Sequence, residues 1–115
     1  MTTPIDPSTF NTLLDSIGGD RAFLAELVAT FLTDGPVQLE ALHAALARGD
    51  AETCRRAAHS LKSNAASFGA LALAALCKEL EDVGRSGDLA AAPELLARVE
   101  AEFASVRAAL EILSF

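Results

Sequence analysis

The sequence predicts an all-α protein, an antiparallel up-down four-helix bundle with an additional short helix at its N-terminal end. Apolar side chains recur at steps of three and four residues through most of the chain, which is the period of a helix with one buried face. Hydrophobic residues make up 51% of the 115 residues, and Trp and Tyr are absent. Short turns of Gly, Asp and Pro separate the periodic stretches. We expect residues 1–115 to form one domain whose core needs neither a metal nor a disulfide.

A short first helix is expected to begin at Asp6 and Pro7, because an acidic N-cap followed by proline favours helix initiation. Gly18 and Gly19 would end this helix. Its apolar stripe consists of Phe10, Leu13, Leu14 and Ile17. We expect it to lie across one end of the main bundle.

A long second helix is expected between its N-cap, Asp20, and Gly49. Its apolar positions are Leu24, Leu27, Val28, Phe31, Leu39, Leu42 and Leu46. These positions keep one phase on both sides of Gly35 and Pro36, which predicts a single axis. Proline removes a backbone donor and crowds the preceding turn. The segment is therefore either one kinked helix, which we favour, or two nearly collinear helices.

Three further helices are expected over residues 51–67, 70–84 and 92–113, with Gly84, Gly87 and Asp88 in the turn before the last one. The expected core positions are Leu73, Leu76, Cys77, Leu80 and Val83 in the first of the last two helices, and Leu96, Val99, Phe103, Val106, Leu110 and Leu113 in the second.

Lys78, Glu81 and Arg85 stand three and four residues apart, so they form one stripe on the helix expected over residues 70–84. Such a stripe is typically a solvated ladder of ion pairs. Alternatively, in an antiparallel hairpin with the helix over residues 51–67, it lies along the face that carries His59.

The net charge of −7 argues against nucleic acid as a partner. Its distribution is uneven: residues 55–85 contain five basic and three acidic side chains, a net +2, so the rest of the chain carries −9. No basic leader with an apolar segment opens the sequence, and the longest apolar run, residues 70–77, is too short to cross a bilayer. We expect a soluble, cytoplasmic protein without a membrane segment.

Both cysteines, Cys54 and Cys77, fall on apolar helix faces, where a free thiol behaves as a small hydrophobe in a reducing compartment. Together with His43 and His59 they could suggest a zinc site. However, Cys54 and His59 project from opposite sides of one helix, so we expect no metal.

His59 is the residue that core packing does not explain. On a helical wheel, the residues that share one direction are Cys54, Ala57, Ala58, Leu61, Ala65 and Phe68. His59 lies nearly opposite Leu61 and therefore points to solvent. Arg55, Lys62 and Ala66 flank it on one side, and Arg56 and Ser63 on the other. These neighbours are small or cationic, which would suit a phosphorylated imidazole approached closely by a partner.

The string Ala58-His59-Ser60-Leu61-Lys62-Ser63, with Gly69-Ala70, Leu73, Cys77 and Leu80-Glu81 at fixed spacing, closely resembles the signature of histidine-containing phosphotransfer (HPt) domains. The match keeps one register within the region 54–85. The family pattern usually has Gly where this chain has Ser63, followed here by Asn64. Since Ser is small, partner docking should survive, although its hydroxyl could change local hydration or the lifetime of phosphohistidine.

The resemblance implies that His59 exchanges a phosphoryl group with the aspartate of a response-regulator receiver domain, and that a hybrid histidine kinase feeds the relay. The receiver would bring Mg²⁺, so no cofactor is expected on this chain, which would be a carrier and not an enzyme. Lys62, one turn from His59 and expected to face solvent, would offset the phosphoryl charge, with Arg55 and Arg56 as weaker candidates.

The resemblance further suggests that Glu81 or a bound water holds the other ring nitrogen of His59 and that Arg85 helps at the rim of the interface. The partner-facing surface would combine Ser63 and Ala66 with apolar side chains of the second helix, Val37 or Leu32. We expect a monomer.

Two other functions stay open at this point. One is a helical-bundle adaptor that binds a receiver or kinase domain without carrying phosphate, since charge around His59 could serve docking alone. The other is a metal-binding bundle.

Overall fold

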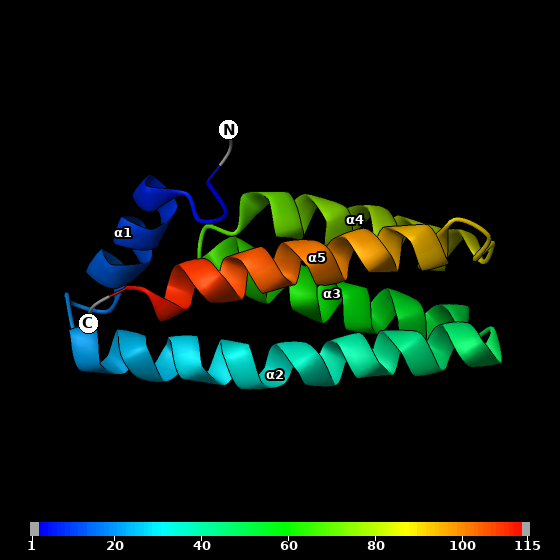
Figure 1. The fold of residues 1–115 in the computed structure, drawn as a ribbon, viewed down its shortest axis with the longest axis horizontal. Helices are drawn as coiled ribbons and strands as arrows, with labels where there is room; N and C mark the ends of the chain where they lie inside the picture. The colour runs from blue at the N-terminus through cyan, green and yellow to red at the C-terminus, as the bar shows by residue number, and fades with distance from the viewer. Residues whose placement is uncertain (1–2, 114–115) are drawn as a thin grey trace.

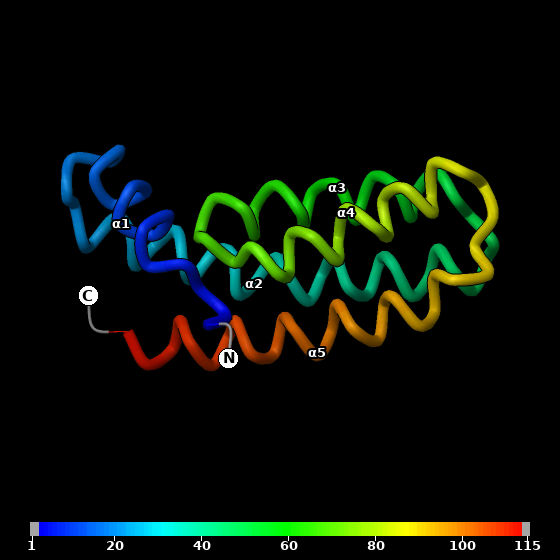
Figure 2. Tube along the Cα trace, turned by 90° about the horizontal axis from the view of Figure 1, so that it is seen from above, coloured from blue at the N-terminus to red at the C-terminus, as the bar shows by residue number. Residues whose placement is uncertain are grey.

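The computed structural model describes residues 3–113, and in this range the chain forms helices and no strand. In chain order they are α1 (Pro7–Ser16), α2 (Arg21–Arg48), α3 (Ala51–Ser67), α4 (Leu71–Ser86) and α5 (Ala92–Glu111). Figure 1 shows α2 to α5 running alternately up and down the long axis, with α1 at one end of the bundle. Figure 2, turned by 90°, shows the same arrangement. The predicted fold class and the place of α1 are confirmed.

Aspartate side chains cap the first three helices. Asp6 accepts a hydrogen bond from the backbone N–H of Thr9, and Asp20 accepts one from that of Phe23. Asp50 does the same at the start of α3, with Thr53 as the donor. Each bond satisfies a backbone donor that the first helical turn leaves free and is typically worth about 1 kcal/mol.

The segment containing Pro36 is a single helix, so the alternative of two collinear helices is wrong. Because proline has no N–H, the carbonyl of Leu32 loses its intrahelical donor. Arg107 of α5 replaces that donor with a hydrogen bond from Nη2 to the carbonyl oxygen of Leu32, 3.0 Å long. The guanidinium also lies 5.4 Å from the ring centre of Phe103. A contact between helices thus restores what the proline removes.

The core lies along the bundle axis and contains the apolar faces that the periodicity predicted. Phe31 contacts Phe68 on one side and Phe103 on the other, with ring centres 5.0 and 5.6 Å apart. The prediction for Leu113 is wrong: α5 ends at Glu111, so this side chain lies beyond the helix and is exposed.

Gly84 is not part of the predicted turn. The fourth helix continues to Ser86, and Gly87, with a φ of +82°, ends it in the left-handed conformation that glycine favours. Gly84 lies inside α4 against α3, where a Cβ atom would stand 2.8 Å from the backbone nitrogen of Arg55 and 3.0 Å from the carbonyl oxygen of Ala51. The missing side chain therefore allows the two helices to approach closely.

We expect Gly84→Ala to lower the free energy of unfolding by about 1–3 kcal/mol, because the added methyl group meets backbone atoms that cannot rotate away. Glu79→Ala is the matched control, because this side chain is exposed on the same helix and the change should stay within about 0.5 kcal/mol. Chemical denaturation of both variants tests this. An equal loss in the two variants would contradict it.

Candidate functional site

The exposed face of α3 carries His59, as the helical wheel predicted. Its side chain is 55% exposed. The opposite face of α3 is fully inside the bundle, where Cys54, Ala58, Leu61 and Ala65 have no exposed surface. A helix that is packed this tightly on one side fixes the direction in which the imidazole projects.

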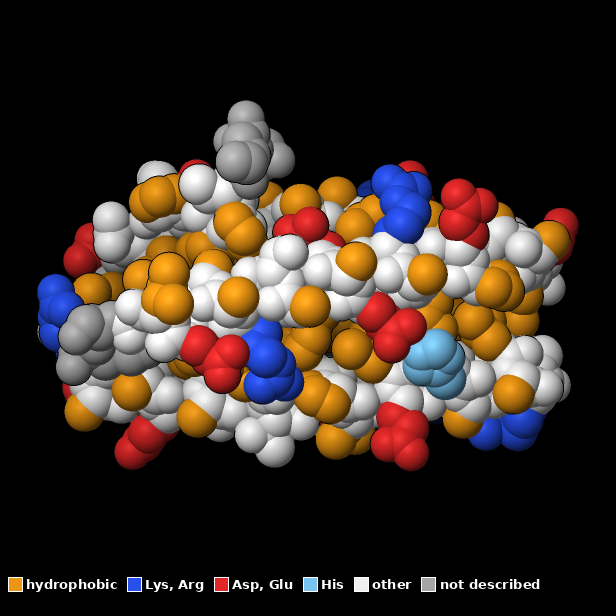
Figure 3. All heavy atoms as spheres, viewed as in Figure 1, with side chains coloured by type: hydrophobic (Ala, Val, Ile, Leu, Met, Phe, Trp, Pro, Cys, Tyr) orange, Lys and Arg blue, Asp and Glu red, His pale blue; other side chains and the backbone are white. Residues whose placement is uncertain are grey.

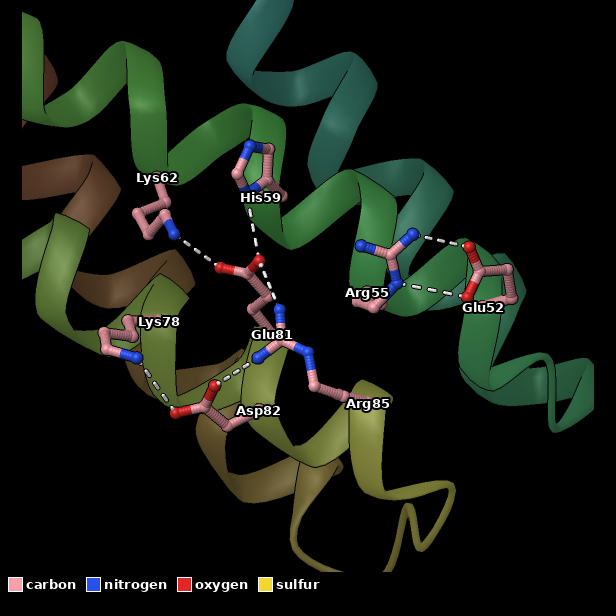
Figure 4. A network of polar contacts seen from close by, with 8 residues as sticks. All are labelled: Glu52, Arg55, His59, Lys62, Lys78, Glu81, Asp82 and Arg85. Carbon is pink, nitrogen blue, oxygen red and sulfur yellow. Dashed lines mark hydrogen bonds and ion pairs between the residues drawn. The ribbon is translucent and has the colours of Figure 1, made fainter.

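Glu81 of α4 is the partner of that imidazole. Its side chain is only 4% exposed, and its carboxylate accepts three hydrogen bonds (Figure 4). The donors are His59 Nδ1 at 2.9 Å and Arg85 Nη2 at 3.1 Å, both to Oε2, and Lys62 Nζ at 2.6 Å to Oε1. A buried carboxylate is stable only with such partners.

The charge state of Glu81 determines the tautomer of His59. The hydrogen bond from Lys62, assisted by that from His59, lowers the pKa of Glu81 from 4.5 to about 2 against the opposing effect of burial. At neutral pH the carboxylate is therefore ionised and can only accept hydrogen bonds. Nδ1 of His59 must carry the hydrogen, which leaves the lone pair of the neutral ring on Nε2.

Lys62 is less open to solvent than the sequence predicted. Its side chain is 27% exposed, because it bends across to the buried carboxylate of Glu81. The stripe on α4 also differs from a simple ladder: Glu81 turns toward α3, whereas Lys78 pairs with Asp82 at 3.3 Å. The alternative in which this stripe lies along the His59 face is thus confirmed for Glu81 and Arg85.

The two arginines that precede His59 are bound elsewhere. Arg55 makes two hydrogen bonds to Glu52, from Nε at 3.1 Å and from Nη2 at 2.6 Å. Arg56 Nε lies 3.8 Å from the same carboxylate. Ser63 and Ala66 are exposed on α3, as expected. Because both side chains are short, they do not project beyond the imidazole.

Asp82 is the site residue that the sequence analysis missed. Its carboxylate accepts a hydrogen bond from Arg85 Nη1 at 2.9 Å as well as the one from Lys78. Arg85 is therefore held between two carboxylates, Glu81 and Asp82. The signal was available, because Asp82 stands three residues before Arg85 and four after Lys78.

Neither cysteine takes part in the site. Cys54 and Cys77 are free and fully buried, as predicted. Burial raises the pKa of both thiols, that of Cys77 to about 12, so they stay protonated and unreactive. Within residues 3–113, no group of three or more potential metal ligands comes together.

Two grooves follow the seam between α2 and α3. The larger has a volume of about 370 Å³ and is lined by Leu13, Leu27, Thr30, Phe31, Asp34, Asn64, Ser67 and Phe68. The smaller, of about 240 Å³, is lined by Gln38, Ala41, Thr53, Arg56, Ala57 and Ser60. Val37 is exposed nearby on α2, whereas Leu32 is half-buried.

The face formed by α5 and α2 is different in character. Figure 3 shows side chains of both charges scattered among apolar ones over the described part of this face, without a continuous basic patch. The cluster of cations around one imidazole is thus a feature of the α3 and α4 side. A helical bundle that presents an imidazole in this way is the arrangement of a histidine phosphotransfer protein.

Comparison with known proteins identifies the family. The family model described as "Hpt domain" matches residues 26–109. The structure is similar to that of histidine-containing phosphotransfer protein B (HptB) from Pseudomonas aeruginosa PAO1, with a TM-score of 0.86 and 37% sequence identity over 96% of this chain and 94% of that one. A search of curated proteins gave no significant match. The chain belongs to the Hpt domain family, whose members carry phosphoryl groups in phosphorelays.

None of the helices within residues 3–113 combines the length and the apolar character needed to cross a membrane.

Because the pKa of Glu81 is lowered in the folded protein, the free energy of unfolding should depend on pH. Because the folded-state pKa is about 2 and the ordinary value is 4.5, the ionised carboxylate stabilises the fold above pH 4.5. This contribution, about 1–3 kcal/mol, should be lost as the pH falls through that interval. Urea denaturation between about pH 6 and about pH 3 should show a shallower decline for Glu81→Gln than for the wild type. The pKa values of Asp6 and Asp50 are also lowered, but these residues are present in both proteins and contribute equally to both curves. Equal declines of the free energy of unfolding in the wild type and Glu81→Gln would therefore contradict the assignment to Glu81.

Proposed function

We propose that His59 is the phosphoacceptor of this Hpt protein and that it exchanges a phosphoryl group with the aspartate of response-regulator receiver domains. The observation that carries the proposal is the bond between Nδ1 of His59 and the buried, ionised Glu81. In the neutral tautomer that this bond selects, the lone pair lies on Nε2 of an exposed ring, which is what a nucleophile at phosphorus requires.

The transfer step uses this geometry directly. The lone pair of Nε2 attacks the phosphorus of an aspartyl phosphate, an N–P bond forms, and the O–P bond breaks to return the electron pair to the aspartate carboxylate. The ring becomes positively charged while Nδ1 keeps its hydrogen. The carboxylate of Glu81, 2.9 Å from Nδ1, stabilises that charge. The reverse step regenerates the neutral imidazole, so the same contact serves both directions.

Lys62 would offset the charge of the phosphoryl group. Its ammonium group has three donors, and Glu81 Oε1 takes one of them. The remaining donors are available to a phosphoryl oxygen. The tight contact to Glu81 holds Lys62 near His59 and lowers the entropy cost of recruiting it.

The receiver would dock over the low surface around His59. Ser63 and Ala66 allow close approach, Arg85 stands at the rim, and exposed Val37 offers an apolar contact across the α2 and α3 seam. The receiver partner would supply the aspartate and Mg²⁺, so this chain needs no cofactor of its own. The setting we infer is a multistep relay in the cytoplasm, with a hybrid histidine kinase upstream and a monomeric carrier.

Incubation with phosphorylated receiver domains should transfer label to the wild-type protein, in a form that is labile to acid and stable to base. His59→Gln should abolish this label, because the amide nitrogen is not nucleophilic, while the circular dichroism of the helices stays unchanged. His43→Gln is the matched control on α2 and should label normally. Failure to label with every receiver, together with retained receiver binding, would instead favour a non-phosphorylated adaptor.

Lys62→Ala should slow transfer or shorten the lifetime of phosphohistidine, because it removes a cation beside the phosphoryl group. A charge-assisted hydrogen bond of this kind is worth about 1.5–3 kcal/mol, or roughly a tenfold change or more in rate. A quenched time course of label transfer measures the rate, and circular dichroism checks the fold. An unchanged transfer rate and phosphohistidine lifetime in a folded variant would contradict this role of Lys62.

A further inference from the structure

The residues around His59 lie on two flanks of α3. On the α4 flank, Lys62 reaches Glu81, and the backbone of Arg55 lies against Gly84. On the α2 flank, Arg56 and Ser60 line the smaller groove, whose other wall comes from Gln38 and Ala41 of α2. The two consecutive arginines therefore face different helices.

The orientation of the ring turns Nε2 away from Glu81. Nδ1 is turned toward α4 by its bond to Glu81, and the outward directions of Nδ1 and Nε2, which flank Cε1, diverge widely. Figure 4 shows the second nitrogen of His59 pointing away from Glu81. A phosphoryl group on Nε2 would thus extend away from the carboxylate of Glu81.

The cations near His59 differ in how firmly they are already held. Lys62 and Arg85 are bound to Glu81, and Arg55 makes two close hydrogen bonds to Glu52. Arg56 has only the 3.8 Å contact to Glu52, a carboxylate that Arg55 already engages, and its side chain is 67% exposed. Among the described residues around His59, Arg56 is the cation that can move at the lowest cost.

Helix geometry brings Arg56 within reach. A side chain on a helix leans toward the N-terminus, so the imidazole covers the turn that contains the residues three and four positions earlier. Arg56 is three positions before His59. Its planar guanidinium offers paired donors that match phosphoryl oxygens.

We propose that Arg56 binds the phosphoryl group carried on Nε2 of His59, from the α2 side, and that its neighbour Arg55 does not. This assignment rests on the proposed function of His59. Arg56 would then add a second cation on the α2 flank to Lys62 on the α4 flank, where Glu81 fixes the ring.

Phosphoramidate as a small phosphodonor tests this without a receiver, so docking contacts cannot contribute. Nε2 attacks the phosphorus of phosphoramidate that is protonated on nitrogen. The new N–P bond forms as the P–N bond of the donor breaks, and neutral ammonia leaves. In Arg56→Ala we expect the half-life of the phosphorylated protein to fall by about two- to fivefold, the effect of one exposed ion pair. Arg56→Lys should recover part of the loss, because the charge remains without the paired donors.

Arg55→Ala is the matched control and should keep the wild-type half-life. The ³¹P resonance of the phosphorylated protein gives a second readout, since it should shift in Arg56→Ala and stay in place in Arg55→Ala. Equal half-lives and resonances in the wild type and Arg56→Ala would overturn the assignment of Arg56 and leave the function of His59 intact. If phosphoramidate labels the wild type and His59→Gln to the same extent, or labels neither, the proposed function itself fails.

Discussion

The site depends on one buried charge, the carboxylate of Glu81. Removing a carboxylate from water is costly, and the structure offsets this cost with three donors from three different positions: His59, Lys62 and Arg85. Two of these donors come from α3 and one from α4, so the carboxylate ties the helices together as well as orienting the imidazole. The Glu81 carboxylate therefore contributes both to the stability of the fold and to the reactivity of His59.

That arrangement requires α3 and α4 to lie close together. Gly84 makes this possible one turn beyond Glu81, because a methyl group there would meet the backbone of α3. The distance between Glu81 and His59 is set by this backbone contact and by the buried residues Leu61, Cys77 and Leu80. The 2.9 Å hydrogen bond between His59 and Glu81 is thus a consequence of helix packing.

Much of this was predictable from the sequence. Periodicity alone located α3 and the direction of His59, because a helix with five small or apolar residues on one face has only one way to bury them. Charge pairing was harder to predict. Lys62 and Glu81 are nineteen positions apart, and only the spatial approach of two helices shows that the lysine turns inward. For the same reason the sequence places Gly84 in a turn: glycine is common in turns, and its use in close helix contacts leaves no local signal.

The coupling through Glu81 also determines how the cations of the site can be compared. Removing Lys62 takes away a possible phosphoryl contact and, at the same time, leaves a buried carboxylate with fewer donors. The two effects are not additive, because the residues belong to one network. Arg56 stands outside this network, joined to Glu52 by a single long contact. Its effect on a phosphoryl group would therefore be separable from the orientation of the ring. A carrier gains from this separation, since the side that fixes the nucleophile stays constant while the side that holds the phosphoryl group changes with each transfer.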